Sequence, residues 1–478
     1  PAAAAPKTSL VLGMSVEPTG LDPTAAAPVA IGQVTWLNVF EGLVAIDREG
    51  RVTPRLAASW TVSPDGLTYT FALRDGVTFH DGTPFDASVA KFALDRARGT
   101  QSVNPQKRFF ASIEAIDTPD PKTLVIRLTR RTGSLLYWLG WPASVIVAPS
   151  SAATAATAPV GTGPFRFVSW SKGDRVELAR NPDWWNRDRP VALDKVVFRF
   201  VGDPQAQAAA LRAGDIDAFP EFAAPELMAS FKGDARLVTE IGDTELKVVA
   251  GMNSGRKPFD DRRVRRALMM AIDRAAVIEG AWSGLGTAIG SHYTPNDPGY
   301  VDLTGVVPYD PAGAKKLLAE AGLPNGFAFS IKTPQMAYAP RSAQVIQAYL
   351  AEIGVEMTIE PTEFPAQWVQ TAFKNRDFDM TIVAHAEPMD IDIYARDPYY
   401  FNWRNPAFDE AIRRAEETAD ADERAKIHGE AQKILAEEVP ALFLFVMPKL
   451  GVQDRRIQGL WKNEPIPSNV LEEVRWSE

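Results

Sequence analysis

Apolar and polar residues follow two different periods along this chain. Residues 9–18 (SLVLGMSVEP) are an apolar run that a proline ends, and residues 66–76 alternate apolar and polar positions between two glycines, so each predicts a strand. Residues 86–98 instead repeat apolar positions at helical spacing behind Asp86. That pattern predicts a helix that this aspartate caps.

The same patterns continue to residue 282. In chain order we expect strands at 123–129 and 144–150, a connector rich in small residues at 151–159, a hairpin around 171–173, a strand at 195–201, a helix from 203 that leads into a short strand near 219, a strand at 246–254 and one long helix at 260–282. The small-residue connector is a candidate crossing between two lobes.

From residue 310 to residue 447, helices and strands alternate. We expect helices at 310–321, 341–353, 365–375 and within 406–438, and strands at 327–333, 355–361, 378–384 and 441–447. Such alternation is typical of an α/β domain with helices on both faces of its sheet. The tail resembles short strand and loop, and it has to return to the first lobe. The predicted fold class is α/β with two lobes, the second inserted late in the first.

Length and composition narrow the class of protein. At 478 residues the chain exceeds what one core usually supports, so two or three domains are expected. The 46% hydrophobic and 23% charged residues are ordinary for a globular protein, and no run approaches the roughly 18 apolar residues of a membrane span. A net charge of −9 and a pI of about 5.3 argue against a nucleic-acid or anionic-membrane partner, because both need a basic surface.

The chain has no cysteine. This removes disulfides, thiolate zinc sites and cysteine nucleophiles, and it suits a protein secreted without oxidative folding. The start, PAAAAPKTSL, has no cationic segment followed by an apolar one, and its small residues resemble the lead that remains after a signal sequence is cut. We therefore expect an exported chain whose signal peptide is removed or absent, with no lipid anchor visible.

Residues 385–394 (HAEPMDIDIY) gather chemically active side chains where a predicted strand leaves the core. Glu387, Asp390 and Asp392 follow that apolar strand together with His385, one of four histidines. These residue types allow a metal site, a catalytic acid–base pair, a cradle for a positively charged ligand, or a solvated loop.

The residues themselves weaken two of these alternatives. The spacing matches no metal-ligand motif, and His80, His292 and His428 lie in unrelated segments. Two working carboxylates of a glycosidase usually come from different elements, and no G-x-S-x-G, H-E-x-x-H or Walker sequence indicates catalysis. The ligand cradle and the solvated loop stay open, because ligands bind at strand ends in open α/β sheets.

Three further patterns have structural and functional interpretations. Four arginines fall on the predicted helix at 260–282, and we expect a solvated, ion-paired face there rather than a phosphate site; they are Arg262, Arg263, Arg265 and Arg266. GTGP (161–164) lacks a P-loop lysine and opens a hairpin, which leaves a turn whose N–H groups approach a ligand. Most of the twelve tryptophans are expected in the core, with Trp403 among the candidates for an apolar ligand cleft.

Several blocks of sequence carry a family resemblance, in order along nearly the whole chain. They are LDP (21–23), NVFEGLV (38–44), PRLAASWTVSPDGLTYTFALRDGVTFHDGTPFDASVAKF (54–92), APVGTGPFRFVSW to VELARNPDWW (158–185), NSGRKPFDDRRVRRALMMAIDR (253–274) and YDPAGAKKLLAEAG (309–322). Together they resemble the extracytoplasmic solute-binding proteins of ABC transporters, in the dipeptide/oligopeptide/nickel-binding family (bacterial solute-binding protein family 5).

This resemblance implies a periplasmic-binding-protein-like fold, in which a hinge joins two lobes and an extra subdomain is inserted in lobe I. The main part of lobe I would comprise 1–39, 158–252 and 449–478, the inserted subdomain 40–157, and lobe II 253–448. The chain crossings near residues 252 and 448 would act as hinges, and closure of the lobes would enclose the ligand.

The resemblance also implies a role for the 385–394 segment. In dipeptide- and oligopeptide-binding members, a loop resembling G-D-x-x-D-P follows the corresponding strand, and its first aspartate pairs with the ligand's α-amino group. Here Glu387 aligns with that aspartate and Asp390 follows, while His385 stands where the family usually has a tryptophan. In the loop at 332–342, Met336 replaces the carboxylate-holding arginine of dipeptide binders, and Arg341 is the nearest candidate.

We therefore expect ligand contacts from both lobes. The candidate ligand-binding residues are Glu387, Asp390, His385, Met336, Tyr338, Arg341, Trp403, Gly163, Met14 and Glu17. No catalytic residue, no metal ligand and no cofactor is expected.

The implied function is capture of a peptide or related cationic organic solute in the periplasm and its delivery to an inner-membrane ABC permease, with no chemistry on the solute. The expected protein is a monomer without a nucleic-acid partner. Two alternatives stay open. One is a binding protein of the same fold for a nickel-type metal chelate, held through His385, or for another small solute. The other is a hydrolase on the same scaffold with Glu387 and Asp390 as acid and base.

Overall fold

The computed structural model describes residues 7–396, 399–418 and 420–477. The expected lead at the start of the chain falls largely on residues 1–6, outside the described residues. The chain divides into unit 1, Pro1–Asp243 with Lys449–Glu478, and unit 2, Thr244–Pro448. The lobe boundaries implied by the resemblance stay a prediction. Among the described residues, no helix combines the length and apolarity of a membrane span.

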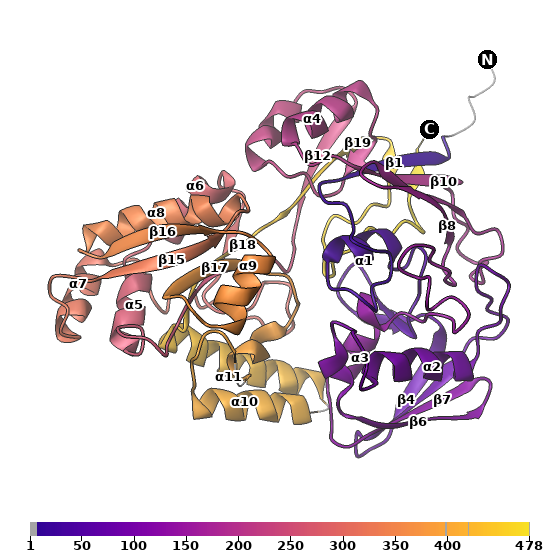
Figure 1. The fold of residues 1–478 in the computed structure, drawn as a ribbon, viewed down its shortest axis with the longest axis horizontal. Coiled ribbons are helices and arrows are strands. Elements are labelled where there is room, and N and C mark those ends of the chain that lie inside the picture. Colours follow the sequence, from indigo (N-terminus) through magenta and orange to yellow (C-terminus); the bar gives the residue numbers. More distant parts are fainter. Residues whose placement is uncertain (1–6, 397–398, 419, 478) are drawn as a thin grey trace. The chain divides into compact units, whose positions relative to one another are not determined.

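Unit 1 is built on a mixed sheet whose strands come from both ends of the chain (Figure 1). Its described residues form the order β12 (Leu237–Gly242), β19 (Lys449–Asp454), β11 (Ala218–Phe219), β1 (Ser9–Met14), β10 (Lys195–Phe200), β9 (Arg175–Arg180) and β8 (Phe165–Ser171). β1 runs parallel to β10 and β11, and the predicted hairpin is the β8–β9 pair. β19 lies between β11 and β12, so the chain returns to this sheet after unit 2.

The rest of unit 1 consists of a second sheet, two strand pairs and short helices. The second sheet has the order β4 (Ala57–Val62), β5 (Thr68–Leu73), β7 (Thr123–Leu128) and β6 (Ile113–Asp120), and the pairs are β2 (Val44–Ile46) with β3 (Val52–Pro54) and β20 (Ile457–Gln458) with β21 (Arg475–Trp476). The helices are α1 (Val29–Thr35), α2 (Ala87–Arg98), α3 (Leu135–Leu139) and α4 (Pro204–Ala213). Asp86 caps α2 as predicted, accepting from the N–H groups of Ser88 and Val89.

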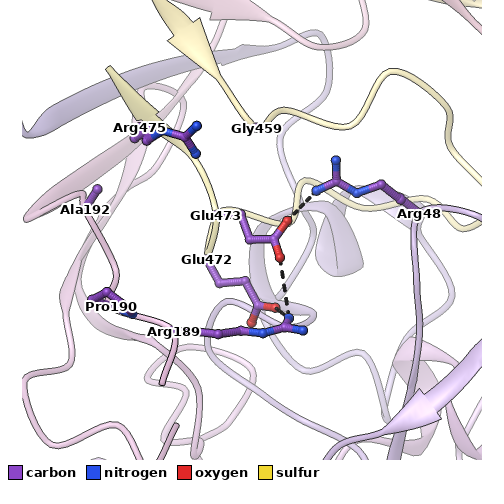
Figure 2. Close-up of a pocket in the computed structure, with 8 residues that line it drawn as sticks. All are labelled: Arg48, Arg189, Pro190, Ala192, Gly459, Glu472, Glu473 and Arg475. Atoms are coloured by element: carbon purple, nitrogen blue, oxygen red, sulfur yellow. Dashed lines mark hydrogen bonds and ion pairs between the residues drawn. The ribbon is translucent and has the colours of Figure 1, made fainter. Parts of the chain in front are cut away.

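Ion pairs hold the C-terminal tail to the rest of unit 1 around a pocket of about 500 Å³ (Figure 2). Glu472 is 6% exposed and accepts from Arg55 at 2.6 Å and from Arg189 at 3.1 Å. The neighbouring Glu473 pairs with Arg48 and Arg189, but its side chain is 44% exposed. Arg55 also donates to the buried Glu41 at 2.6 Å, so the guanidinium bridges two carboxylates away from water.

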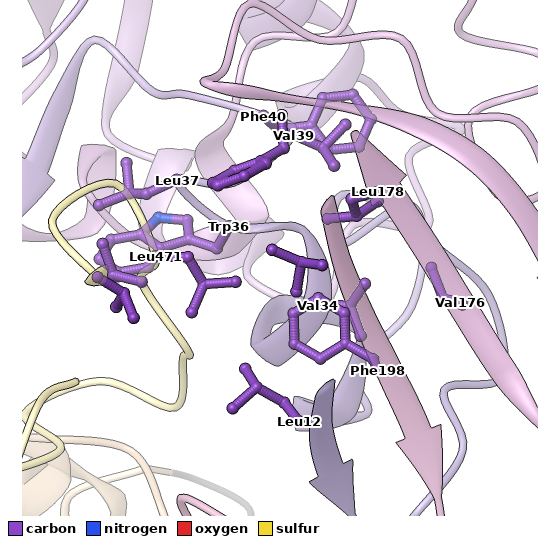
Figure 3. Packing of buried hydrophobic residues seen from close by; sticks show 14 of the residues in the cluster. Leu12, Val34, Trp36, Leu37, Val39, Phe40, Val176, Leu178, Phe198 and Leu471 are labelled. Atoms are coloured by element: carbon purple, nitrogen blue, oxygen red, sulfur yellow. The ribbon is translucent and has the colours of Figure 1, made fainter. Parts of the chain in front are cut away.

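The core of unit 1 also draws on distant segments (Figure 3). Val34 from α1 packs with Leu12 of β1 and Phe198 of β10, and Leu471 of the tail lies on the side of Trp36. A separate apolar cluster, which includes Phe71 and Leu94, joins the second sheet to α2.

Unit 2 has one mixed sheet with its most apolar strands in the middle. The order is β14 (Thr287–Ala288), β18 (Ala441–Val446), β13 (Lys247–Met252), β17 (Met380–His385), β15 (Ala328–Pro334) and β16 (Glu356–Thr362). β15, β16 and β17 run parallel, whereas β13 is antiparallel to β17 and β18. Every residue of β13 and β18 is buried, as expected for strands covered on both faces.

Helices cover both faces of the unit 2 sheet. One face carries α5 (Arg262–Met270), α6 (Arg274–Trp282), α7 (Pro311–Glu320) and α8 (Tyr338–Glu352), and the other carries α9 (Ala366–Trp368), α10 (Pro406–Glu417) and α11 (Ala421–Glu438). Alternate residues of β13 divide between the two cores, Val248 in one and Val249 in the other. α7 and α10 begin at Asp310–Pro311 and Asn405–Pro406, where a side-chain cap precedes a proline.

Three predictions of local structure are wrong. Residues 144–150 form no strand, although Val145 to Ala148 are buried. No strand pairs with them through backbone hydrogen bonds, and the Ile146 N–H donates to the Glu41 carbonyl instead. The single helix at 260–282 is two helices, because Asp273 caps a new helix by accepting from the Ala275 N–H. The expected loop at 332–342 ends earlier, since α8 begins at Tyr338.

The arginine face of α5 is only partly solvated. Arg265 is 4% exposed and donates to the Glu438 and Val439 carbonyls at the end of α11. Arg262 and Arg266 both donate to the Glu437 carbonyl. These cations therefore meet the unpaired carbonyls at a helix C-terminus, where the helix dipole favours positive charge.

We predict that Glu472 and Glu473 differ sharply in their effect on stability. Glu472→Gln leaves the buried Arg55 with only one of its two carboxylate partners, Glu41. We therefore expect the free energy of unfolding to fall by about 3–5 kcal/mol. Glu473→Gln removes a solvent-exposed partner and should cost less than about 1 kcal/mol. Urea denaturation followed by tryptophan fluorescence measures both, and equal losses would contradict the assigned difference in burial.

Candidate ligand-binding site

Three parallel strands of unit 2 end at the same edge of its sheet. Met336 follows β15, Phe364 follows β16 and residues 385–390 end and follow β17. β13 runs the opposite way, so its first residue, Lys247, pairs with His385 at this edge. We call this group of residues the carboxyl edge; in open α/β sheets such edges are where ligands bind.

Asp390 is the most deeply buried carboxylate of the carboxyl edge, at 3% exposure. Its Oδ1 lies 3.0 Å from Nζ of Lys247, whose side chain is fully buried, and 3.1 Å from Nε2 of His292. Nδ1 of His385 lies 3.6 Å from the other carboxylate oxygen. The negative charge of Asp390 is therefore neutralised by a buried ammonium of the same unit.

The two other carboxylates of the segment have different surroundings. Asp392 accepts two hydrogen bonds of 2.8 Å from the Arg396 guanidinium, one at each oxygen. Glu387 lies half-buried in the turn after β17, and its backbone carbonyl accepts from Lys247 Nζ at 2.7 Å. Asp390 and Asp392 thus each pair with a cation of the same unit.

Backbone contacts fix the turn that carries Glu387. Met389 adopts φ 52°, a left-handed conformation that costs a non-glycine residue about 1 kcal/mol or more. Its N–H donates to Asp297 Oδ1 at 3.0 Å, and Asp297 also accepts from the Thr294 N–H. The strained residue is thereby held between a carbonyl bound to Lys247 and a buried carboxylate.

Electrostatics divide the buried acids of this region into two kinds. Burial opposes the ionisation of Asp390, but attraction to Lys247 and His292 overcomes it and holds the pKa of Asp390 well below its usual range. Burial and the neighbouring Asp297 raise the pKa of Glu245 well above its ordinary value. Burial likewise works against the charged Lys247, yet Asp390, Asp297 and Glu245 together raise its pKa. An ammonium and a carboxylate thus stay ionised without contact with water.

The fold brings together histidines that the sequence places in unrelated segments. The rings of His292 and His385 lie 4.8 Å apart, and each has one nitrogen beside a tyrosine hydroxyl: Tyr394 at 3.1 Å and Tyr400 at 2.9 Å. Ligand atoms of His292, His385 and Asp390 lie within 4.8 Å of one another, a donor set that suits nickel or zinc. A resident metal ion does not fit, however, because the Lys247 ammonium lies 3.0 Å from the same carboxylate oxygen and would repel it.

Apolar side chains complete the carboxyl edge. Met336 is 46% exposed and Phe364 is 39% exposed. Tyr338 is buried on the first turn of α8 and accepts a hydrogen bond from the Ala384 N–H; burial raises its pKa to about 12. Arg341 is half-buried on the same turn, and Trp403 is 6% exposed within the apolar cluster of α10 and α11.

The unit 1 candidates have structural contacts of their own. Met14 lies at the end of β1 in the core, and Glu17 accepts from the Trp170 indole N–H and the Gly173 N–H at the β8–β9 turn. At Gly163, a Cβ would lie 2.4 Å from the Asn38 carbonyl oxygen, so close backbone packing explains the glycine. Its own carbonyl lies near His80 Nε2 and accepts from the Asn181 amide.

Residues that organise the carboxyl edge include some that the sequence patterns did not single out, namely Lys247, His292, Asp297, Phe364 and Tyr400. A signal existed for Lys247, because a lysine that starts the apolar strand LKVVAGM needs a buried partner. No sequence pattern identifies that partner, Asp390, which lies 143 residues later in the chain, in the turn after β17.

Comparison with known proteins places these features in a family. The family model described as "Bacterial extracellular solute-binding proteins, family 5 Middle" matches residues 51–407. The glutathione-binding protein GsiB of Salmonella typhimurium is 30% identical over 485 residues, covering 96% of this chain and 93% of that protein.

Solved structures agree with the sequence match. The periplasmic binding protein DppA of Helicobacter pylori, in complex with the peptide STSA, has a TM-score of 0.83 at 25% identity, covering 99% of each chain. AgaA of A. tumefacien R10, in complex with agropinic acid, has a TM-score of 0.82 at 25% identity, covering 98% of this chain and 99% of the other. The predicted fold class, a periplasmic-binding-protein-like α/β fold, is confirmed.

The buried histidines of unit 2 predict acid sensitivity. Burial and repulsion by Arg424 lower the pKa of His428 to about 4, and its Nδ1 lies 2.8 Å from the Tyr293 hydroxyl. In the unfolded chain His428 has a pKa near 6.5, so between pH 6.5 and 4 the unfolded state binds a proton that the folded state does not bind. The free energy of unfolding therefore falls as the pH drops from about 6.5 toward 4.

Between pH 7 and pH 5, we expect His428 to account for a loss of about 2 kcal/mol in unfolding free energy. Denaturant titrations at both pH values measure this, and His428→Gln should shrink the difference by that amount. An identical pH dependence in the variant would show that His428 titrates normally in the folded protein.

Proposed function

Because this chain belongs to family 5 of the bacterial extracellular solute-binding proteins, we propose that it binds a peptide or related organic solute that carries an ammonium group. The family confirms the expected class, a solute-binding protein of ABC transporters and not an enzyme, and it sets the hydrolase alternative aside. We further propose a periplasmic location, delivery of the solute to an inner-membrane permease and the lobe boundaries that the resemblance implies.

One observation carries the ligand proposal: Glu387 is a half-buried carboxylate on a fixed turn at the carboxyl edge. A carboxylate in such a place favours a cation, because desolvation strengthens a hydrogen-bonded ion pair. Asp390 and Asp392 form ion pairs with Lys247 and Arg396 of the same unit.

The apolar part of the edge supports an organic solute rather than an inorganic cation. Exposed Met336 and Phe364 offer surface to the aliphatic portion of a ligand. Relatives bind solutes of this general kind: GsiB is a glutathione-binding protein, and DppA is complexed with a peptide. Met336 in place of an arginine argues against a free dipeptide held at both ends.

We predict that removing the Glu387 charge weakens binding of an amine-bearing ligand. For the peptide Ser-Thr-Ser-Ala, Glu387→Gln should cost about 2–5 kcal/mol if the ammonium faces this carboxylate. Glu356→Gln is the matched control, because Glu356 is exposed at the start of β16, on the opposite edge of the same sheet. Isothermal titration measures each dissociation constant.

The same experiment with the N-acetylated peptide closes a double-mutant cycle. If ammonium and carboxylate meet, acetylation and Glu387→Gln should cost far less together than the sum of their separate effects. Additive losses, or an unchanged dissociation constant in Glu387→Gln, would count against the assignment. Native mass spectrometry of freshly purified protein identifies any co-purified ligand that should replace the tetrapeptide in the cycle.

A second candidate, a metal chelate as cargo, rests on the two imidazoles that converge on Asp390. Nickel ions with and without free histidine test it by thermal unfolding. The leading proposal predicts no change in melting temperature with either. A rise that requires both nickel and histidine and disappears in His385→Ala would favour the chelate instead.

A further inference from the structure

The pocket beside the C-terminal tail of unit 1 lies near the amino ends of two parallel strands (Figure 2). Its residues Arg189, Pro190 and Ala192 come just before β10, and Arg475 lies in β21. The next residue, Trp476, donates from its indole N–H to the carbonyl of Ser9 at the start of β1, at 2.9 Å. β1 and β10 run parallel from this end, whereas open α/β sheets bind their usual ligands at the carboxyl ends.

Two neighbouring carboxylates of the tail hold the cations on one side of the pocket, with unequal strength. Burial opposes the ionisation of Glu472, but attraction to Arg55 and Arg189 overcomes it and lowers its pKa. Glu473 is 44% exposed and pairs with Arg48 and, at 3.5 Å, with Arg189. Because exposed ion pairs contribute at most about 1 kcal/mol, an anion from solution can compete with Glu473 for Arg189.

Arg475 is the cation of this pocket that lacks a partner. Its side chain is exposed and makes no hydrogen bond or ion pair with any residue in the ranges 7–396, 399–418 and 420–477. Its guanidinium points toward the interior of the pocket (Figure 2). A positive charge at the wall of the pocket is therefore left for a group that the protein does not supply.

The backbone around Arg475 is fixed without a ligand. Arg475 pairs with Gln458 between β21 and β20, and Trp476 is anchored to β1. Gly459 has φ 92°, and a Cβ there would lie 2.4 Å from the Glu473 carbonyl oxygen, so the two walls of the pocket meet backbone to backbone. Walls that are already in place lower the entropic cost of binding.

The lining and the size of the pocket indicate the class of ligand. A guanidinium presents a planar fork that matches a carboxylate with two parallel hydrogen bonds, and Arg189, 54% exposed, supplies a second fork beside Arg475. Pro190 and Ala192 add apolar surface. A volume of about 500 Å³ lies within the range of small-molecule pockets, roughly 300–1,000 Å³, and is more than one inorganic oxyanion fills.

We propose that this pocket is a second ligand site, separate from the one proposed in unit 2, that binds a small organic polycarboxylate through Arg475 and Arg189. Arg475 receives one carboxylate. A second carboxylate takes the contact with Arg189 that Glu473 otherwise holds. The inference goes beyond the proposed function, because this ligand is an anion rather than an ammonium-bearing solute.

Isothermal titration with citrate, at an ionic strength held constant with sodium chloride, tests the site. We expect Arg475→Gln to weaken citrate binding by about tenfold to a hundredfold, the effect of losing hydrogen bonds to a charged group. Arg130→Gln is the matched control, because Arg130 is an exposed arginine of unit 1 that also has no side-chain partner among the described residues and does not line the pocket. An unchanged dissociation constant in Arg475→Gln, or an equal loss in Arg130→Gln, would overturn the proposal.

A second variant tests the competition for Arg189 by a gain of affinity, which a damaged fold cannot produce. Glu473→Gln removes the competing carboxylate from an exposed position, so citrate should bind several-fold more tightly. Weaker or unchanged binding would contradict the contact assigned to Arg189.

Amide hydrogen exchange locates the bound anion. Citrate should slow exchange over residues 471–477 in the wild-type protein and not in Arg475→Gln, whose melting temperature without citrate should match the wild type. Protection that appears only elsewhere in the chain would show that citrate binds at another place. Inorganic phosphate is the comparison ligand, and binding as tight as that of citrate would show that the polycarboxylate class is wrong.

Discussion

A single buried ion pair, Lys247 with Asp390, governs the carboxyl edge of unit 2. An ammonium at zero exposure is tolerable only where charge and hydrogen-bond acceptors replace its water, and here a carboxylate and two carbonyls do so. The pair ties the start of β13 to the turn after β17. Lys247 Nζ also contacts the Glu387 carbonyl, and Asp390, which follows the left-handed Met389, lies 3.1 Å from His292.

The pair also explains how three carboxylates so close in sequence can do different things. Asp390 pairs with Lys247, and Asp392 pairs with Arg396, which follows the short helix Asp390–Tyr394. In the sheet, β15, which Met336 follows, lies between β17, which Glu387 follows, and β16, which Phe364 follows.

Unit 1 follows a related rule at its C-terminal tail. Arg55, 5% exposed, bridges Glu41 and Glu472, so the tail is fixed by a charge that would be costly if unpaired. The adjacent Glu473 makes similar bonds in water and contributes little. In both units, ion pairs that are shielded from water contribute most to stability, whereas exposed pairs such as Arg413 with Glu410 contribute little.

Most elements could be predicted because their causes are local. Asp86 before α2, the Asp–Pro and Asn–Pro starts of α7 and α10, and the apolar runs of β13 and β18 each carry their own signal. The errors came where a local signal had two outcomes: residues 144–150 are apolar but lack a strand partner, and Asp273 reads equally as a helix surface residue or as a cap.

The sequence by itself determined the α/β class, the family and the segment 385–394 as the candidate site, because periodicity, helix caps and the blocks that resemble the family are set by neighbouring residues. Only the tertiary structure decided what that segment does with its charges. Lys247, His292 and Asp297 reach it from other strands and loops, and their partners follow from the register of β13 and β17. Coulombic interaction and desolvation depend on distance in space, which no spacing along the chain specifies.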